Sequence, residues 1–203
     1  MFAQVIQGRT SDAQALRSAM EDWTRELAPG SVGWLGSTGG VTDDGRFIAV
    51  ARFESADAAD RNSHRPEQSK WWEETQRLLD GEVTFHDSED VTVDLPGDPD
   101  RAGFVQIMQG RVTDPARAKE LMARMPSDAM AAYRPDILGS MSIGYGDGDW
   151  TQVLYFTSEA EAREGERKET PPEMQAVMEQ MTAISTGPPD FFDLREPILQ
   201  SPS

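Results

Sequence analysis

The sequence of 203 residues contains no cysteine and only two histidines, His64 and His86. Without cysteine, the chain forms no disulfide, no thiolate metal site and no iron–sulfur cluster, and it carries no cysteine nucleophile. Two histidines are too few for a site that needs several imidazole ligands. The acidic segments lack the ligand spacing of a calcium-binding loop, so we predict that the protein has no metal site.

Positive charge and long apolar runs are also scarce. The chain has 19 basic against 36 acidic residues, for a net charge of −17, and this charge repels phosphate backbones and anionic lipid surfaces. No apolar run approaches the roughly 18 residues that a membrane-spanning helix needs, and the chain does not begin with a signal-peptide pattern. We expect a cytoplasmic protein with no nucleic-acid partner and no membrane partner.

What the sequence does contain is an internal repeat. Residues 2–12 read FAQVIQGRTSD and residues 104–114 read FVQIMQGRVTD, with only conservative mismatches. Further along, FESADAA at residues 53–59 returns as FTSEAEA at residues 156–162. Chance does not account for such agreement at two separate places, so we interpret the chain as two related halves.

The repeat also predicts the domain boundaries. Each half is large enough to bury a modest core, and 37 % of the residues are hydrophobic. We place a first domain at residues 1–95 and a second at residues 103–199. Residues 96–102, which are rich in proline and aspartate, form the linker, and residues 200–203 form a tail.

Each half alternates between strand and helix patterns in the same order. In the first half we expect a strand at residues 2–8, a helix at 12–27, strands at 32–37 and 47–53, a helical region at 56–79 that Pro66 interrupts, and strand segments at 83–85 and 91–95. In the second half the corresponding elements are a strand at 104–109, a helix at 115–125, strands at 137–144 and 150–156, a helix from Ser158 that breaks near Pro171, and a strand at Phe191 and Phe192.

The order β-α-β-β-α-β, which occurs twice, is that of the ferredoxin-like fold. This fold has a four-stranded antiparallel sheet with both helices on one face. We therefore predict an α+β protein that consists of two tandem ferredoxin-like repeats.

The strand patterns indicate that both faces of each sheet are buried. On the third strand, Phe47 and Phe53 share one face, while Ile48 and Val50 lie on the other. Because the helices cover only one face, the simplest cover for the second face is the sheet of the other half. We predict that the two antiparallel sheets pack into an intramolecular α/β barrel. The protein is then a monomer with an intramolecular pseudo-dimer, or a homodimer.

The strand that opens each half, the ESADAA stretch after the third strand, and NSHRPEQSKWW at residues 62–72 resemble the dimeric α/β-barrel superfamily, in particular its antibiotic biosynthesis monooxygenase-like members. The resemblance covers both halves. It implies a barrel that many members build from two subunits and that this chain builds from its own two copies. Members include cofactor-independent monooxygenases that form quinones and enzymes that degrade haem.

On this resemblance, the candidate catalytic residues are Asn62, His64, Trp71 and Trp72. Asn62 and His64 precede the break at Pro66, where an interrupted helix can direct polar side chains into a cavity. In the family, a His on this helix binds haem iron, whereas an Asn and a Trp orient substrate and dioxygen in cofactor-free members. The alternative is that Asn62 ends the helix and His64 is a solvated surface residue. Trp71 and Trp72 point in different directions, so we expect one in the core and the other at a pocket or rim.

Three further residues are candidates for substrate binding. Trp34 on the second strand and Phe47 on the third are suited to stack on a flat aromatic molecule. His86 follows a core residue of the last strand and has an apolar counterpart, Phe192, in the second half, which indicates a partly buried position. With His64 it would supply acid–base chemistry if both share a cavity.

The two halves differ at these candidate positions. Gly165 and Arg167 stand where the first half has Asn62 and His64, and Val177 and Met178 replace the two tryptophans. After a duplication, one copy can keep a site while the other becomes a packing partner. We therefore place the site in the cavity of the first half, although drift without function predicts the same pattern.

These observations lead to three functional hypotheses. The first is a monooxygenase-like barrel protein that binds a small apolar or aromatic molecule and oxidises it without a bound cofactor, because an electron-rich substrate reduces dioxygen itself once it is desolvated and oriented. The second is a non-catalytic small-molecule-binding or interaction protein on the same scaffold, because a fold alone does not carry a chemistry. The third is haem binding or degradation with His64 as the ligand.

Overall fold

The computed structural model describes residues 1–95, 97–125 and 127–202. Pro96 of the predicted linker and Ser203 of the predicted tail lie outside the described residues. In the part that is described, no helix is both long enough and apolar enough to cross a membrane.

The chain forms two compact units. The first contains residues 1–91 together with residues 192–203, and the second contains residues 92–191. The C-terminal segment therefore belongs to the unit that the first repeat builds.

The first repeat follows the predicted order of strands and helices. It contains β1 (Phe2–Arg9), α1 (Ala13–Glu26), the short 3-10 helix η1 (Ala28–Gly30), β2 (Trp34–Val41), β3 (Arg46–Phe53), α2 (Ala56–Ser63), α3 (Pro66–Gln76) and β4 (Thr84–Ser88). The strand β5 (Asp90–Asp94) and the 3-10 helix η2 (Pro99–Arg101) lead into the second repeat.

The second repeat has the same order with one extra helix and one extra strand. It contains β6 (Phe104–Arg111), α4 (Pro115–Ala123), α5 (Ser127–Tyr133), β7 (Ile137–Gly144), β8 (Asp149–Phe156), α6 (Glu159–Glu166), α7 (Pro172–Ile184), β9 (Asp190–Leu194) and β10 (Ile198–Gln200).

Equivalent side chains begin equivalent helices in the two repeats. The carboxylates of Asp12 and Asp114 accept a backbone N–H from the first turns of α1 and α4, each at 2.9 Å. The hydroxyls of Ser55 and Ser158 cap α2 and α6 in the same way. Pro66 starts α3 at a position where its missing N–H costs nothing. These local interactions explain why helices begin at matching positions in the two repeats.

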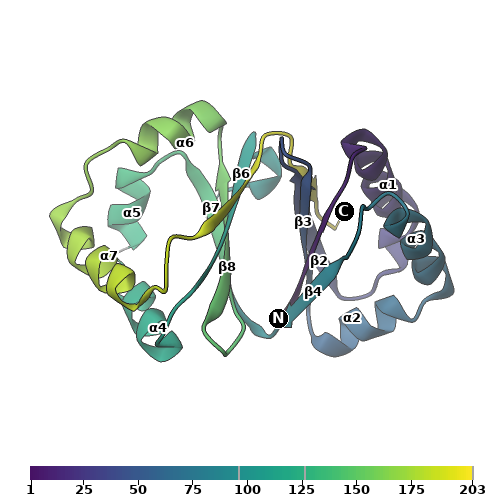
Figure 1. Ribbon diagram of the computed structural model, residues 1–203, viewed down its shortest axis with the longest axis horizontal. Coiled ribbons are helices and arrows are strands. Elements are labelled where there is room, and N and C mark those ends of the chain that lie inside the picture. Colours follow the sequence, from purple (N-terminus) through teal and green to yellow (C-terminus); the bar gives the residue numbers. More distant parts are fainter. Residues whose placement is uncertain (96, 126, 203) are drawn as a thin grey trace. The chain divides into compact units, whose positions relative to one another are not determined.

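The strands form two five-stranded sheets, in the orders β10-β2-β3-β1-β4 and β5-β7-β8-β6-β9. Within each sheet, four strands from one repeat have the ferredoxin-like order, and helices cover one face, as Figure 1 shows for each unit. The predicted α+β fold of two tandem ferredoxin-like repeats is confirmed. Hydrogen bonds between the described strands make two separate sheets and do not close them into one barrel. The packing of one sheet on the other stays a prediction.

The fifth strand of each sheet comes from beyond the repeat that builds the rest of it. β10 pairs antiparallel with β2, with Ile198 opposite Gly39 and Gln200 opposite Ser37, and β5 lies beside β7. The Gln200 side chain donates to a backbone carbonyl of α1 at 2.6 Å. The sequence patterns do not indicate β10, which is found only in the structure.

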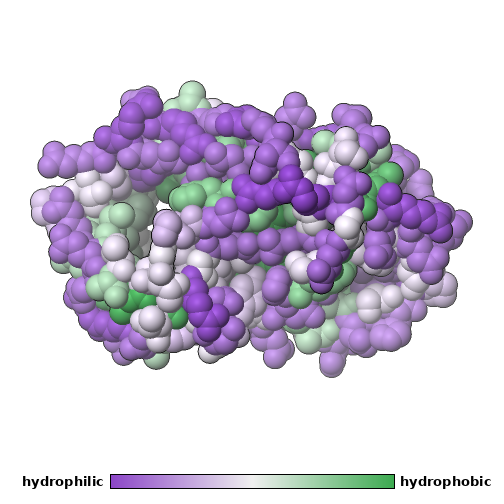
Figure 2. Space-filling view, in the orientation of Figure 1, coloured by the Kyte–Doolittle hydropathy of each residue, from purple (hydrophilic) through white to green (hydrophobic). Residues whose placement is uncertain are grey.

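The core of the first unit lies between its helices and its sheet. Phe2 and Phe53 on adjacent strands pack with residues of α1 and β2 in one cluster, and Phe47 packs with Leu16 and Leu79 in a second. Hydrophilic side chains dominate the face of the molecule in Figure 2 and separate the hydrophobic patches from one another.

Candidate functional site

Three tryptophans of the first unit form one cluster between the helices and the sheet. The ring centre of Trp23 on α1 lies 5.0 Å from that of Trp34 on β2, edge to face, and 6.3 Å from that of Trp71 on α3. Phe2 and Phe53 belong to the same cluster. The structure therefore brings together two predicted site residues, Trp34 and Trp71, that are distant in the sequence.

Each indole N–H of this tryptophan cluster has a hydrogen-bond acceptor within the protein. Trp34 Nε1 donates to Ser37 Oγ at 3.0 Å, and Trp23 Nε1 donates to Gln68 Oε1 at 2.6 Å. Trp71 Nε1 donates to a backbone carbonyl of α1 at 3.0 Å. These bonds fix the ring orientations, as is usual for buried indoles.

Trp72 extends the aromatic series towards the edge of the sheet. Its ring centre lies 6.1 Å from that of Trp71 and 5.4 Å from that of Phe85 on β4. Phe85 is 46 % exposed, so the series reaches the surface. Phe47 lies in the aliphatic cluster against which Trp72 packs, and it is fully enclosed there. Its position is that of a core residue, without a face open to a ligand.

Asn62 serves the break between α2 and α3. Its side chain is largely buried, and Oδ1 accepts from Arg65 Nη1 at 2.9 Å. The same guanidinium donates to the Leu27 carbonyl at 3.0 Å and pairs with Glu67 at 2.9 Å. A backbone N–H, followed by this arginine, holds the pKa of Glu67 below its ordinary value. Asn62 is thus part of a network that ties the helix break to the end of α1.

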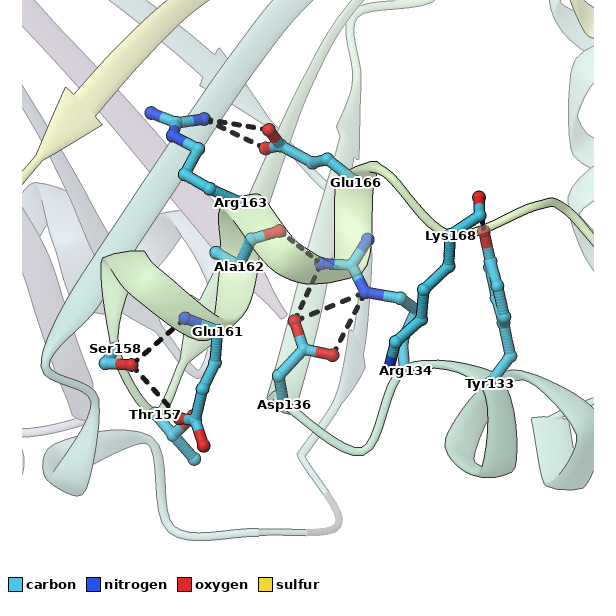
Figure 3. Close-up of polar contacts among 10 residues, drawn as sticks. All are labelled: Tyr133, Arg134, Asp136, Thr157, Ser158, Glu161, Ala162, Arg163, Glu166 and Lys168. Carbon is cyan, nitrogen blue, oxygen red and sulfur yellow. Dashed lines mark hydrogen bonds and ion pairs between the residues drawn. The ribbon is translucent and has the colours of Figure 1, made fainter.

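In the second repeat, different residues fill the space that corresponds to the surroundings of Asn62. A side chain at Gly165, the counterpart of Asn62, would overlap the guanidinium of Arg134. That guanidinium pairs with the buried Asp136 at 2.7 Å and donates to the Ala162 carbonyl at 3.3 Å, as Figure 3 shows. An arginine therefore lies beside α2 in the first repeat and beside α6 in the second, which favours a structural role for Asn62.

His64 lies at the surface, at the end of α2. Its side chain is 74 % exposed, and Nδ1 is 2.8 Å from the backbone carbonyl oxygen of Asp60 in the same helix. A buried haem needs apolar walls around its axial ligand, and an exposed ring at a helix end does not supply them. These residues do not fit a haem. Among the described residues, no group of three or more His, Asp or Glu side chains is arranged to hold a metal ion.

The edge strand β4 carries a polar pair that the sequence does not single out. Asp87 lies opposite Gln4 of β1, and Phe85 lies opposite Ile6. Since Ile6 packs in the helix-facing core, Gln4, Phe85 and Asp87 belong to the helix-facing side of the sheet. Gln4 Nε2 donates to Asp87 Oδ1 at 2.9 Å. The exposed His86 alternates to the other face, so it does not join this pair.

A hollow of about 380 Å³ lies on the surface of the second unit. It is lined by residues of α7 and of the segment before it, namely Thr170, Gln175, Met178, Glu179 and Thr182. None of the predicted site residues lines it.

Comparison with known proteins shows the fold. A candidate monooxygenase from Lactobacillus acidophilus NCFM superposes with a TM-score of 0.74 at 15 % identity, over 98 % of this chain and 96 % of that chain. An anthrone oxidase-like protein superposes with a TM-score of 0.65 at 14 % identity, over 98 % and 93 %. A ferredoxin-fold protein from Listeria monocytogenes 4b F2365 that is related to antibiotic biosynthesis monooxygenases gives 0.50 at 11 % identity, over 100 % and 95 %.

The chain has the antibiotic biosynthesis monooxygenase-like ferredoxin fold. The resemblance seen in the sequence is confirmed at this level. No family model matches the sequence, and no curated protein matches it either. At these identities the monooxygenase-like fold describes the architecture, and the chemistry has to be argued from the side chains.

Proposed function

We propose that this monooxygenase-like protein binds a small, flat aromatic molecule beside α3 and the edge of the first sheet and promotes its oxidation by dioxygen. The observation that carries the proposal is the position of the Gln4–Asp87 pair. It shares the helix-facing side of β1 and β4 with Phe85, whose ring contacts Trp72. A carboxylate and partly exposed aromatic rings thus occur together.

The aromatic rings supply the binding surface. Trp71 and Trp72 are half-buried and Phe85 is more exposed, so a planar molecule gains stacking and edge contacts there without unfolding the core. Four partly buried alanines pack against the tryptophan cluster: Ala28, Ala51, Ala56 and Ala59. Small neighbours favour the approach of a flat ring.

Asp87 supplies the base. An anthrone, the class named for one of the structural neighbours, has an acidic methylene group. Transfer of one methylene proton to the Asp87 carboxylate gives a carbanion, which passes one electron to dioxygen, and the carbon radical and superoxide combine to a peroxide anion. Return of the proton from Asp87 gives the hydroperoxide, which loses water to give the quinone. One substrate and one dioxygen yield one quinone and one water, and Gln4 orients the carboxylate throughout.

Oxygen uptake and quinone absorbance with anthrone test the proposal. We expect D87N to lower kcat by about a hundredfold, the usual value of a general base, and W72A to raise KM by about fivefold through the lost aromatic contact. D193N is the matched control, because Asp193 holds the corresponding place on β9, where α7 offers Val177 and Met178 instead of indoles. A wild-type rate equal to the spontaneous rate would disprove oxidation of this substrate class.

A second candidate is binding without catalysis. One observation favours it: His64 lies exposed on its own helix and His86 lies on the other face of β4, so neither histidine assists Asp87. In that case anthrone quenches tryptophan fluorescence saturably, W72A weakens the quenching, and no oxygen is consumed. The same protein preparations therefore decide between the two functions.

A further inference from the structure

Four of the five tryptophans in the chain form one uninterrupted series of rings. It runs from Trp34 through Trp23 and Trp71 to Trp72, with successive ring centres 5.0, 6.3 and 6.1 Å apart. The series begins on the buried strand β2 and ends beside the exposed ring of Phe85. Indoles are among the side chains that lose an electron most easily, and neighbouring rings at contact distance exchange electrons readily.

The hydrogen bonds of the series allow the electron vacancy of an oxidised indole to move from ring to ring. An oxidised indole is a radical cation whose N–H proton is acidic, and loss of that proton traps the radical on one ring. Trp34, Trp23 and Trp71 donate to a hydroxyl, an amide oxygen and a backbone carbonyl, respectively. None of these acceptors is a base, so the proton stays on each ring.

Solvent exposure gives the series a direction. Trp34 and Trp23 are buried, whereas Trp71 and Trp72 are half-buried. A positive charge in the apolar interior is costly and is stabilised where water reaches it. The radical cation is therefore more stable at the Trp72 end, where its proton can pass to water.

The second repeat does not continue this arrangement. Ile137 occupies the position of Trp34 in the strand pairing, since both lie opposite the last phenylalanine of the neighbouring strand. Val177 and Met178 follow Pro172 as Trp71 and Trp72 follow Pro66. The series is thus a property of the first unit and not of the fold that the repeats share.

We propose that the four tryptophans form a relay that carries oxidising equivalents from the interior of the first unit to its surface. A one-electron oxidant that reaches β2 from solution, such as an organic peroxyl radical, takes one electron from Trp34 and a proton from water and becomes a hydroperoxide. This oxidant is separate from the substrate proposed to bind beside Trp72. Electrons from Trp23, Trp71 and Trp72 then refill the rings in turn, and ascorbate or a thiol in solution returns one electron to Trp72. One electron passes from the external reductant to the oxidant, and the protein ends unchanged.

The absence of cysteine permits a direct test that needs no substrate, so its outcome is independent of the proposed oxidation. Val32 is 76 % exposed and lies two residues before Trp34. V32C therefore offers a single attachment point for a ruthenium photo-oxidant near the buried end. After flash oxidation without an external reductant, peptide mass spectrometry locates the oxidised indole.

We expect the modification mainly at Trp72. W71F should move it to Trp34 and Trp23 and slow the recovery of the reduced dye, while W150F, which alters the tryptophan outside the series, should change neither. W72F should leave the modification at Trp71. Because Trp72 is only half-buried, this second variant tests the relay if W71F does not fold. Equal modification of Trp72 with and without Trp71, or modification confined to Trp34 in the V32C protein, would overturn the relay.

Discussion

Asn62 and Gly165 occupy equivalent positions in the two repeats, and an arginine side chain lies beside each of them. Arg65 reaches Asn62 from the start of α3, whereas Arg134 reaches the space above Gly165 from the segment before β7. A guanidinium therefore lies beside this position in both repeats, but different segments of the chain supply it. The Asn62 side chain fits beside Arg65, whereas any side chain at position 165 would overlap Arg134.

We predict that G165A destabilises the protein by about 2 kcal/mol, the usual cost of overpacking. The added methyl group would displace a guanidinium that is 12 % exposed and paired with Asp136. Urea unfolding measures the change. G187A is the control, because Gly187 has no neighbouring atom within 4 Å of an added Cβ, and it should change stability by less than about 0.5 kcal/mol. Equal effects of the two substitutions would contradict this account of Arg134.

Asn62→Ala should reduce stability by about 1 to 2 kcal/mol, because it leaves a partly buried guanidinium without one acceptor. The oxidation rate per folded molecule should stay unchanged, since Asn62 serves the helix break and not the Gln4–Asp87 pair. Thermal unfolding and the anthrone assay give the two readouts. A fall in kcat without a fall in melting temperature would restore Asn62 to a catalytic role.

The contribution of the hairpin between β2 and β3 to folding stability should depend on pH through Asp44. The Thr42 hydroxyl, followed by Arg46, holds the pKa of Asp44 below its ordinary value. Because the folded-state pKa is depressed, this contribution to stability is present above the ordinary Asp pKa and is lost as the pH falls through the folded value. T42V should raise the pKa of Asp44, as NMR titration of its carboxyl carbon will measure.

The same substitution has a thermodynamic consequence. The stability difference between wild type and T42V should be largest above the ordinary Asp pKa of about 3.9 and should shrink at lower pH. Urea unfolding at neutral pH and in acid compares the two proteins. A difference that grows in acid would show that Thr42 does not act through the Asp44 carboxylate.

Removal of residues 197–203 should destabilise the first unit. Ile198 is buried in β10, and its loss alone costs about 2 kcal/mol, while the backbone of β2 becomes an unpaired edge. We expect a lower melting temperature and concentration-dependent aggregation. A chain that ends at Ser201 keeps β10 and is the control. Identical melting curves for the two truncated proteins would mean that β10 contributes nothing to the sheet.

Local patterns account for most of the fold. The repeated strand motif, the alternation of strand and helix patterns, and Pro66 at the break of the second helical region are sufficient to predict two ferredoxin-like repeats. The strand β10 is different, because three residues beside prolines carry no periodicity and their partner β2 is far away in the sequence. Pairing between distant segments is not visible in local patterns.

The same reason limits the prediction of the site. The sequence predicts one of Trp71 and Trp72 in the core and the other at a pocket or rim, whereas in the structure both are half-buried and each packs against a core cluster. Trp34, predicted to stack on a substrate, is buried in the first of these clusters. The sequence does not indicate that Asp87 pairs with Gln4, because only the register of β1 and β4 brings these residues together. Asn62 and His64 stand near each other in the sequence, yet one is buried beside Arg65 and the other is exposed.

The origin of β10 has a consequence for how the protein is made. The ribosome synthesises the chain from its N-terminus, and domains generally fold one after another as they emerge. Here the outer strand beside β2 is translated after β6 to β9 of the second repeat. The unit that the first repeat builds therefore completes its sheet only after the second repeat has been synthesised, and the edge of β2 stays unpaired until then.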